Sequence, residues 1–162
     1  GKLFADNVNG KGNLRYISGN VLTGTRIEAE GALRATHSQL TVIPEGDDVH
    51  EAFGWASLSP KRYSAGATYL KLKKAYRLDA RLLGGPRAII VSNEYDKVFP
   101  LDIFPEQLIK STLAFNIDKM EQLGIYEVAP EDFALCEFVD TSKLELQRIV
   151  RTGLDMLRKE ME

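Results

Sequence analysis

The sequence has one cysteine, Cys136, and two histidines, His37 and His50. A single thiol excludes a disulfide within the chain, and it excludes zinc or iron–sulfur sites built from several of the chain's own thiolates. No apolar run approaches the roughly 20 residues that cross a bilayer. Neither a G-x-G-x-x-G pattern nor a phosphate loop ending in Gly-Lys-Ser/Thr is present. These absences argue against a redox-metal protein, a membrane-spanning protein and a nucleotide-binding enzyme.

The chain has the composition of a globular protein. Of its 162 residues, 44% are hydrophobic and 27% are charged, enough apolar surface for a core. The charges are divided unevenly, with 13 basic and 8 acidic residues up to Ile90 and 8 basic and 15 acidic residues after it. This asymmetry favours two regions with different neighbours, and no basic stripe indicates nucleic acid. We expect a water-soluble, cytoplasmic chain.

The first half of the sequence reads as β structure after a short helix at residues 3–8. Alternating or β-branched segments bounded by glycine, serine or proline predict strands. A hairpin is expected around the Gly-Gly-Pro sequence at residues 84–86. The predicted strands cover residues 14–17, 21–23, 39–43 and 52–58, and the predicted hairpin joins residues 77–82 to 87–91.

The second half reads as helical. Pro105 suits the first turn of a helix, and Gly124 suits the end of the next one. A third helix is expected to open after Ala129, with acidic residues in its first turn. The last helix is predicted over residues 143–161, with Ser142 and Glu145 as a capping box.

Candidate chemical groups are few, and each has a simpler structural explanation. Cys136 lies among apolar residues, where a thiol behaves as a small hydrophobe. His37 lies beside Ser38, without the sequence context of a nucleophile. The basic and tyrosine-containing stretch at residues 61–81 is compatible with an anionic lipid surface, an acidic partner, a nucleic acid or a solvated face. We therefore predict no catalytic residue and no metal site.

Five short motifs occur in an order that resembles a known family. The motifs are ISGNVLTGT at residues 17–25, FGW at 53–55, YDKVFPLD at 95–102, GIYE at 124–127 and EDFALC at 131–136. Together they are similar to the carboxy-terminal part of the A subunit of the bacterial sodium-translocating NADH–quinone reductases. The resemblance covers nearly the whole chain.

The resemblance implies an α+β fold in three parts. Residues 1–60 would form a soluble-ligand-binding β-grasp-like region, residues 61–100 an extended hairpin connection, and residues 101–162 a small helical region. It also implies that the β-grasp region is incomplete, with its first hairpin preceding Gly1. Where many relatives have Cys-Pro-Gly-Lys, this chain has Asp140, Thr141, Ser142 and Lys143, so only the lysine is carried over.

The resemblance further implies a peripheral fragment of a redox-driven sodium pump on the cytoplasmic face of the bacterial inner membrane. NADH, flavins, an iron–sulfur centre and quinone would belong to the parent complex, and this fragment would bind none of them as its own cofactor. Its partners would be the other subunits. The candidates for a quinone slot are Phe53, Trp55 and Tyr63, for which core packing is the simpler explanation. The alternative function is a free-standing small-molecule-binding or scaffold module unrelated to respiration.

Overall fold

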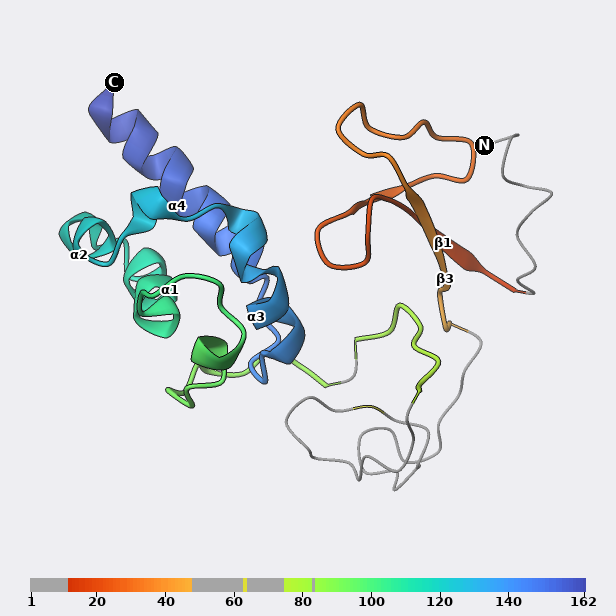
Figure 1. Cartoon of the computed structure of the whole chain (residues 1–162), viewed down its shortest axis with the longest axis horizontal. Helices are drawn as coiled ribbons and strands as arrows, with labels where there is room; N and C mark the ends of the chain where they lie inside the picture. The colour runs from red at the N-terminus through yellow and green to blue at the C-terminus, as the bar shows by residue number, and fades with distance from the viewer. Residues whose placement is uncertain (1–11, 48–62, 64–74, 83) are drawn as a thin grey trace. The chain divides into compact units, whose positions relative to one another are not determined.

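The computed structural model describes residues 12–47, 63, 75–82 and 84–162. The chain divides into two compact units, Gly1–Gly84 and Gly85–Glu162 (Figure 1). The predicted helix at residues 3–8 and the predicted strand at 52–58 lie outside the described residues. The division of the sequence at residues 60 and 100 stays a prediction.

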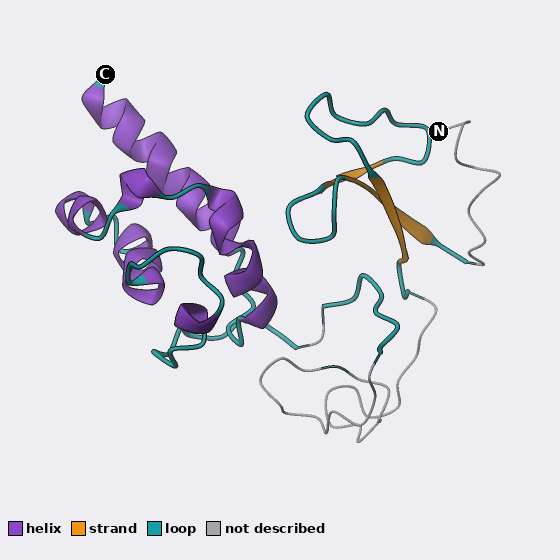
Figure 2. Cartoon of the chain, in the orientation of Figure 1, coloured by secondary structure: helices purple, strands orange, loops and turns teal. Residues whose placement is uncertain are grey.

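The first unit contains an antiparallel sheet in the order β2-β1-β3, drawn as orange strands in Figure 2. The strands are β1 (Leu14–Ser18), β2 (Thr25–Ile27) and β3 (Leu40–Pro44). Tyr16 in the central strand pairs with Ile27 on one side and Val42 on the other. The predicted strands at 14–17 and 39–43 are therefore confirmed. The α+β class is confirmed too, whereas the β-grasp arrangement stays a prediction.

The predicted strand at residues 21–23 is wrong, because this segment is the turn that joins β1 to β2. The side-chain oxygen of Asn20 accepts hydrogen bonds of 2.8 Å from the backbone N–H groups of Leu22 and Thr23. An asparagine that bonds its own following backbone competes with strand pairing and favours a turn. Strand β2 accordingly begins only at Thr25, after Gly24.

The predicted hairpin around residues 84–86 is also wrong, because the described residues of 75–91 form no strand. Their backbone groups bond elsewhere. The N–H of Ala80 donates to the carbonyl of Pro44, and the N–H of Arg87 donates to the carbonyl of Ser142, at 2.9 and 2.8 Å. Both bonds join this segment to residues far away in the sequence rather than to a partner strand within it.

The second unit is helical. Its α-helices are α1 (Pro105–Leu113), α2 (Ile117–Gln122), α3 (Ala134–Val139) and α4 (Leu146–Met161), accompanied by the 3-10 helices η3 (Tyr95–Lys97), η4 (Ile125–Glu127) and η5 (Pro130–Phe133). A closed apolar core joins these elements. Its fully buried side chains include Leu108, Ile109, Met120, Ile125, Phe133, Cys136, Leu146 and Val150.

Local signals fix several of these helices, and those at Pro105 and Gly124 were expected from the sequence. Pro105 starts α1, and the side chain of Asn116 caps α2 by accepting the N–H of Lys119 at 3.0 Å. Gly124 follows α2 with a φ of 84°, a left-handed conformation that favours glycine. Gly153 lets α4 approach α1, because a Cβ at this position would lie 2.7 Å from Cγ2 of Thr112.

The predicted capping box is wrong, because α4 starts at Leu146 and Glu145 makes no side-chain cap. Ser142 is buried and engaged elsewhere. Its backbone N–H donates to Oδ1 of Asp140 at 2.9 Å, and its hydroxyl donates to the carbonyl of Ala88 at 3.3 Å. Across the described ranges, no helix combines the length and the apolar character needed to cross a membrane.

Candidate functional site

The predicted quinone slot is only partly within the described residues. Phe53 and Trp55 lie outside them, whereas Tyr63 is described and half-buried. The ring of Tyr63 packs edge-on against the ring of Tyr76, with 5.4 Å between centroids and 61° between planes. Such aromatic pairs stabilise packing by about 0.5–1.5 kcal/mol. The grouping of Tyr63 with Phe53 and Trp55 stays a prediction.

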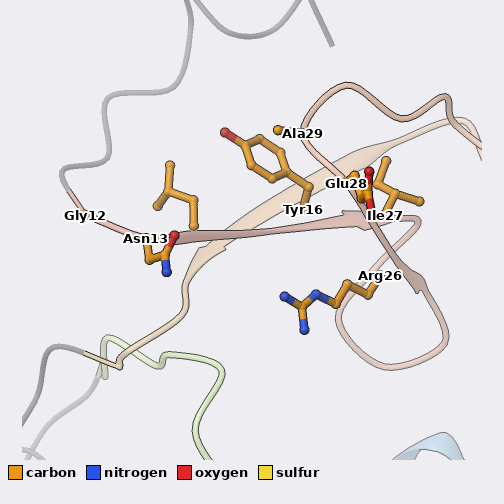
Figure 3. Close-up of a pocket in the computed structure, with 8 residues that line it drawn as sticks. Gly12, Asn13, Tyr16, Arg26, Ile27, Glu28 and Ala29 are labelled. Carbon is orange, nitrogen blue, oxygen red and sulfur yellow. The ribbon is translucent and has the colours of Figure 1, made fainter.

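A pocket of about 650 Å³ lies beside the sheet, at the end of the β1–β2 pairing (Figure 3). Strand β2 ends at Ile27, and the N–H of Gly31 then donates to the carbonyl of Glu28 at 2.9 Å, which turns the chain. Strand β1 extends beyond this point to Leu14, so space is left beside it. The lining residues are Gly12, Asn13, Leu14, Tyr16, Arg26, Ile27, Glu28 and Ala29.

The chemistry of this pocket is mixed. Figure 3 shows the ring of Tyr16 near Ala29, and Arg26 on the opposite side of the β1 ribbon. This follows from the register, because Tyr16 pairs with Ile27 and neighbouring residues along a strand point to opposite faces. The volume is typical of small-molecule pockets, which range over about 300–1,000 Å³. The lining residues include Tyr16, Arg26 and Glu28, but no serine, cysteine or histidine.

A partly buried Ser–His contact lies at the other end of β1. Oγ of Ser18 is 2.9 Å from Nδ1 of His37, and the same oxygen accepts the N–H of Arg34 at 3.0 Å. Ser18 is fully buried, and within the described ranges no carboxylate bonds to His37. The hydroxyl of Ser18 is therefore inaccessible, and the pair lacks the third group that orients a catalytic histidine. It fastens the loop before β3 to the sheet.

The contact between Ser18 and His37 is not evident from the sequence. Ser38 is adjacent to His37 in the sequence, but the pairing of Ser18 with Leu40 brings the loop before β3, and His37 with it, to Ser18. The close approach of His37 to Gly19, where a Cβ would lie 3.2 Å from Nδ1, also depends on the fold. Gly19 is the only feature of the sequence that could have indicated this close approach.

A second buried polar group lies in the helical unit. The hydroxyl of Tyr95 donates to Oδ1 of Asp140 at 2.7 Å, and Oδ2 of Asp140 accepts the N–H of Leu144 at 2.9 Å. Burial, followed by the Asp140 contact, raises the pKa of Tyr95. Asp140 thus holds the turn that precedes α4.

Cys136 is fully buried next to this group, as expected for a small hydrophobe. Burial raises the pKa of its thiol to about 12, with a smaller contribution from the charge of Asp96. The thiol is therefore protonated at neutral pH, and the thiolate is the reactive form. Cys136 has neither the access nor the ionisation of a nucleophile.

Glu106 is buried at the start of α1. Its Oε1 accepts the N–H and the hydroxyl of Ser92 at 3.2 and 3.4 Å, whereas Oε2 has no partner among the described residues. The described part of the chain contains no group of three or more His, Cys, Asp or Glu side chains arranged to hold a metal.

Comparison with known proteins relates this chain to the same subunit in several bacteria. No protein-family model matches the chain. The chain is 38% identical over 154 residues to the A subunit of the Na(+)-translocating NADH-quinone reductase of Serratia proteamaculans. It is 36% identical to the same subunit of Yersinia pestis over 154 residues, and of Neisseria meningitidis over 151 residues.

The extent of this match is as informative as its identity. The alignments cover 90–93% of this chain but only 33–34% of each relative. The chain therefore spans about a third of the length of the curated relatives it matches, corresponding to their C-terminal part. The resemblance predicted from the five motifs is confirmed.

Proposed function

We propose that this chain acts as part of the A subunit of a bacterial sodium-translocating NADH–quinone reductase. The observation that carries the proposal is the identity of 36–38% to that subunit across about nine-tenths of the chain. In this role the chain is a peripheral brace on the cytoplasmic side of the inner membrane. NADH, flavins, the iron–sulfur centre and the translocated sodium belong to the remainder of the complex.

A bracing role is supported by the chemistry of the described residues. The hydroxyl of Ser18 and the thiol of Cys136 are groups of the type that act as nucleophiles. Both side chains are fully buried. The helical unit is held by a closed core and by the Asp140 network, which is the arrangement of a rigid element. Rigid elements position other groups well, and they need no reactive side chain of their own.

Deletion of the helical unit tests this proposal. A strain whose A subunit lacks the residues corresponding to 85–162 should lose sodium-stimulated NADH oxidation in its membranes. The shortened subunit should also fail to co-purify with the other subunits. A matched variant, Cys136→Ala, should retain both, because the thiol has no chemical role. Full activity without the helical unit would contradict the proposal.

Quinone binding is the finer part of the proposal. A quinone head group requires an apolar, aromatic slot with one or two hydrogen-bond donors. Phe53, Trp55 and Tyr63 are the proposed residues. Trp55 is the only tryptophan, so its fluorescence should be quenched saturably by a short-chain quinone. Phe53→Leu should weaken this quenching, and quenching that is linear in quinone would contradict the slot.

A second candidate function is a free-standing small-molecule-binding module. The pocket of about 650 Å³ beside Tyr16 favours it, because its size suits a small ligand. The two candidates differ in their partners. A chain that purifies alone from its native cells and binds a metabolite would support the second candidate, and purification with membrane-embedded redox subunits would support the first.

A further inference from the structure

Strand β1 carries two backbone groups, the N–H and the carbonyl of Leu14, that no described strand pairs. On the β3 side, the carbonyl of Asn13 accepts the N–H of Glu45 at 2.9 Å. Successive residues of a strand direct their backbone groups to opposite neighbours, so the two groups of Leu14 face the side of β2. Strand β2 ends at Ile27, opposite Tyr16, and among the described residues Leu14 has no partner beyond that point.

These two groups border the pocket beside the sheet, which Leu14 helps to line. An N–H and a carbonyl on either side of one carbon are complemented by an extended amino-acid residue, which offers the same pair in reverse. The complementary donor is an N–H, and the complementary acceptor is a carbonyl or a carboxylate oxygen. The backbone of β1 therefore selects a ligand with an N–H and such an acceptor attached to one carbon.

The same pocket contains an arginine without a hydrogen-bonded carboxylate. Arg15 occupies both oxygens of the Glu45 carboxylate through its own guanidinium. Arg26 attracts Glu45 but does not bond to it, and within the described ranges Arg26 forms no ion pair with Glu28 either. A guanidinium in this state favours a carboxylate as the acceptor group of the ligand, because such charge-assisted bonds are the stronger ones.

The side chain of the ligand is expected to be apolar. A residue placed opposite Leu14 directs its side chain to the same face of the sheet as Leu14 and Tyr16, two positions apart on β1. Ile27 lies on this face as well, because it pairs with Tyr16. Figure 3 shows the ring of Tyr16 on this side, near Ala29, with Arg26 on the other side of the β1 ribbon.

We propose that this pocket binds an N-acylated amino acid with an apolar side chain and a free carboxylate, a chemistry that the free end of a short peptide shares. The ligand N–H donates to the carbonyl of Leu14. The ligand carboxylate accepts the N–H of Leu14 and the guanidinium of Arg26, and the side chain packs against Tyr16. The inference goes beyond a role in the reductase, because it concerns the pocket alone and assigns its ligand class.

The test is a titration of the isotopically labelled chain with N-acetyl-leucine, followed by two-dimensional NMR of the backbone amides. We expect a saturable shift of the Leu14 amide resonance. Two altered probes, one N-methylated to remove the donor and one esterified to remove the charge, should each bind about tenfold more weakly. A hexapeptide that ends in leucine distinguishes the two sources. Affinity equal to that of N-acetyl-leucine assigns a small molecule, and tighter binding assigns a peptide end.

Arg26→Gln should weaken the binding of N-acetyl-leucine about tenfold, because it removes the charge-assisted bond. Arg34→Gln is the matched control, since Arg34 is an exposed arginine of the same unit that bonds Thr25 and does not line the pocket. This variant should leave the affinity unchanged. Shifts that do not saturate, or equal affinities for the three leucine probes, would overturn the proposal. Equal weakening by the two variants would overturn the role of Arg26. The chain is tested alone, so the outcome is independent of its place in the reductase.

Discussion

The hydroxyl of Tyr95 lies 2.7 Å from Oδ1 of Asp140, although the two residues are 45 positions apart in the sequence. Both side chains are buried. Asp140 also accepts the N–H groups of Ser142 and Leu144, so one carboxylate joins the segment before α1 to the turn before α4. The loss of the bond to Tyr95 should therefore weaken the helical unit.

Tyr95→Phe should lower the free energy of unfolding by about 1–3 kcal/mol, because it removes one hydrogen bond from a buried carboxylate. Urea unfolding followed by circular dichroism measures the change. Tyr126→Phe is the control, because Tyr126 is exposed and its hydroxyl donates to Glu121 at the surface. An equal loss in both variants would contradict a special role for the buried bond.

Stability should fall at alkaline pH because the folded chain holds the Cys136 proton more tightly than the unfolded chain. The thiol pKa rises from 9.0 to about 12 on folding. Its stabilising contribution is therefore complete below pH 9 and is lost as pH rises toward 12. The limiting slope for one group is about 1.4 kcal/mol per pH unit.

Urea titrations at increasing pH measure this slope. In Cys136→Ala the decline should be shallower between pH 9 and 10, although the variant is less stable overall because a cavity replaces the sulfur. The raised pKa of Tyr95 adds a further decline at higher pH in both proteins. Identical slopes in the two proteins would refute the role of the thiol.

Gly153→Ala should destabilise the helical unit by about 1–2 kcal/mol, because the new methyl group would overlap Cγ2 of Thr112. Thr112→Ser removes that methyl group and retains the hydroxyl, which donates to the carbonyl of Leu108 at 2.9 Å. The double variant should therefore recover most of the loss. If the losses in free energy of unfolding from the two single variants instead add in the double variant, α1 and α4 do not meet at these residues.

Gly24→Ala should disrupt the turn between β1 and β2. A Cβ at Gly24 would lie 2.3 Å from the carbonyl oxygen of Asn20 and 2.5 Å from Cγ2 of Ile17. We expect a loss of about 2 kcal/mol or more in the sheet unit, measured by amide exchange of β1. Gly85→Ala is the control, since no atom lies within 4 Å of its Cβ position.

Elements whose signal lies in residues close together in the sequence could be predicted from it. Alternation and β-branched side chains indicated β1 and β3, and Pro105 and Gly124 marked a helix start and a helix end. The failures came from competing hydrogen bonds. Asn20 bonds the backbone of the segment predicted as a strand, and Asp140 takes the N–H of Ser142 from the predicted capping box.

The candidate site was less predictable because it depends on pairing between distant residues. The pocket exists where β2 ends while β1 continues, and that difference in length follows from the register. The contact between Ser18 and His37 likewise depends on the pairing of β1 with β3. No short-range pattern encodes either arrangement, whereas family membership was apparent from five short motifs.

The most direct test of the central claim is mass spectrometry of the purified complex. Membranes of the organism that encodes this chain should be solubilised, and the fractions that show sodium-stimulated NADH–quinone reductase activity should be purified. We predict that peptides of this chain, including those from residues 105–113 and 146–161, occur in those fractions in a fixed ratio to the other subunits. Active, pure complex that lacks these peptides would contradict the account.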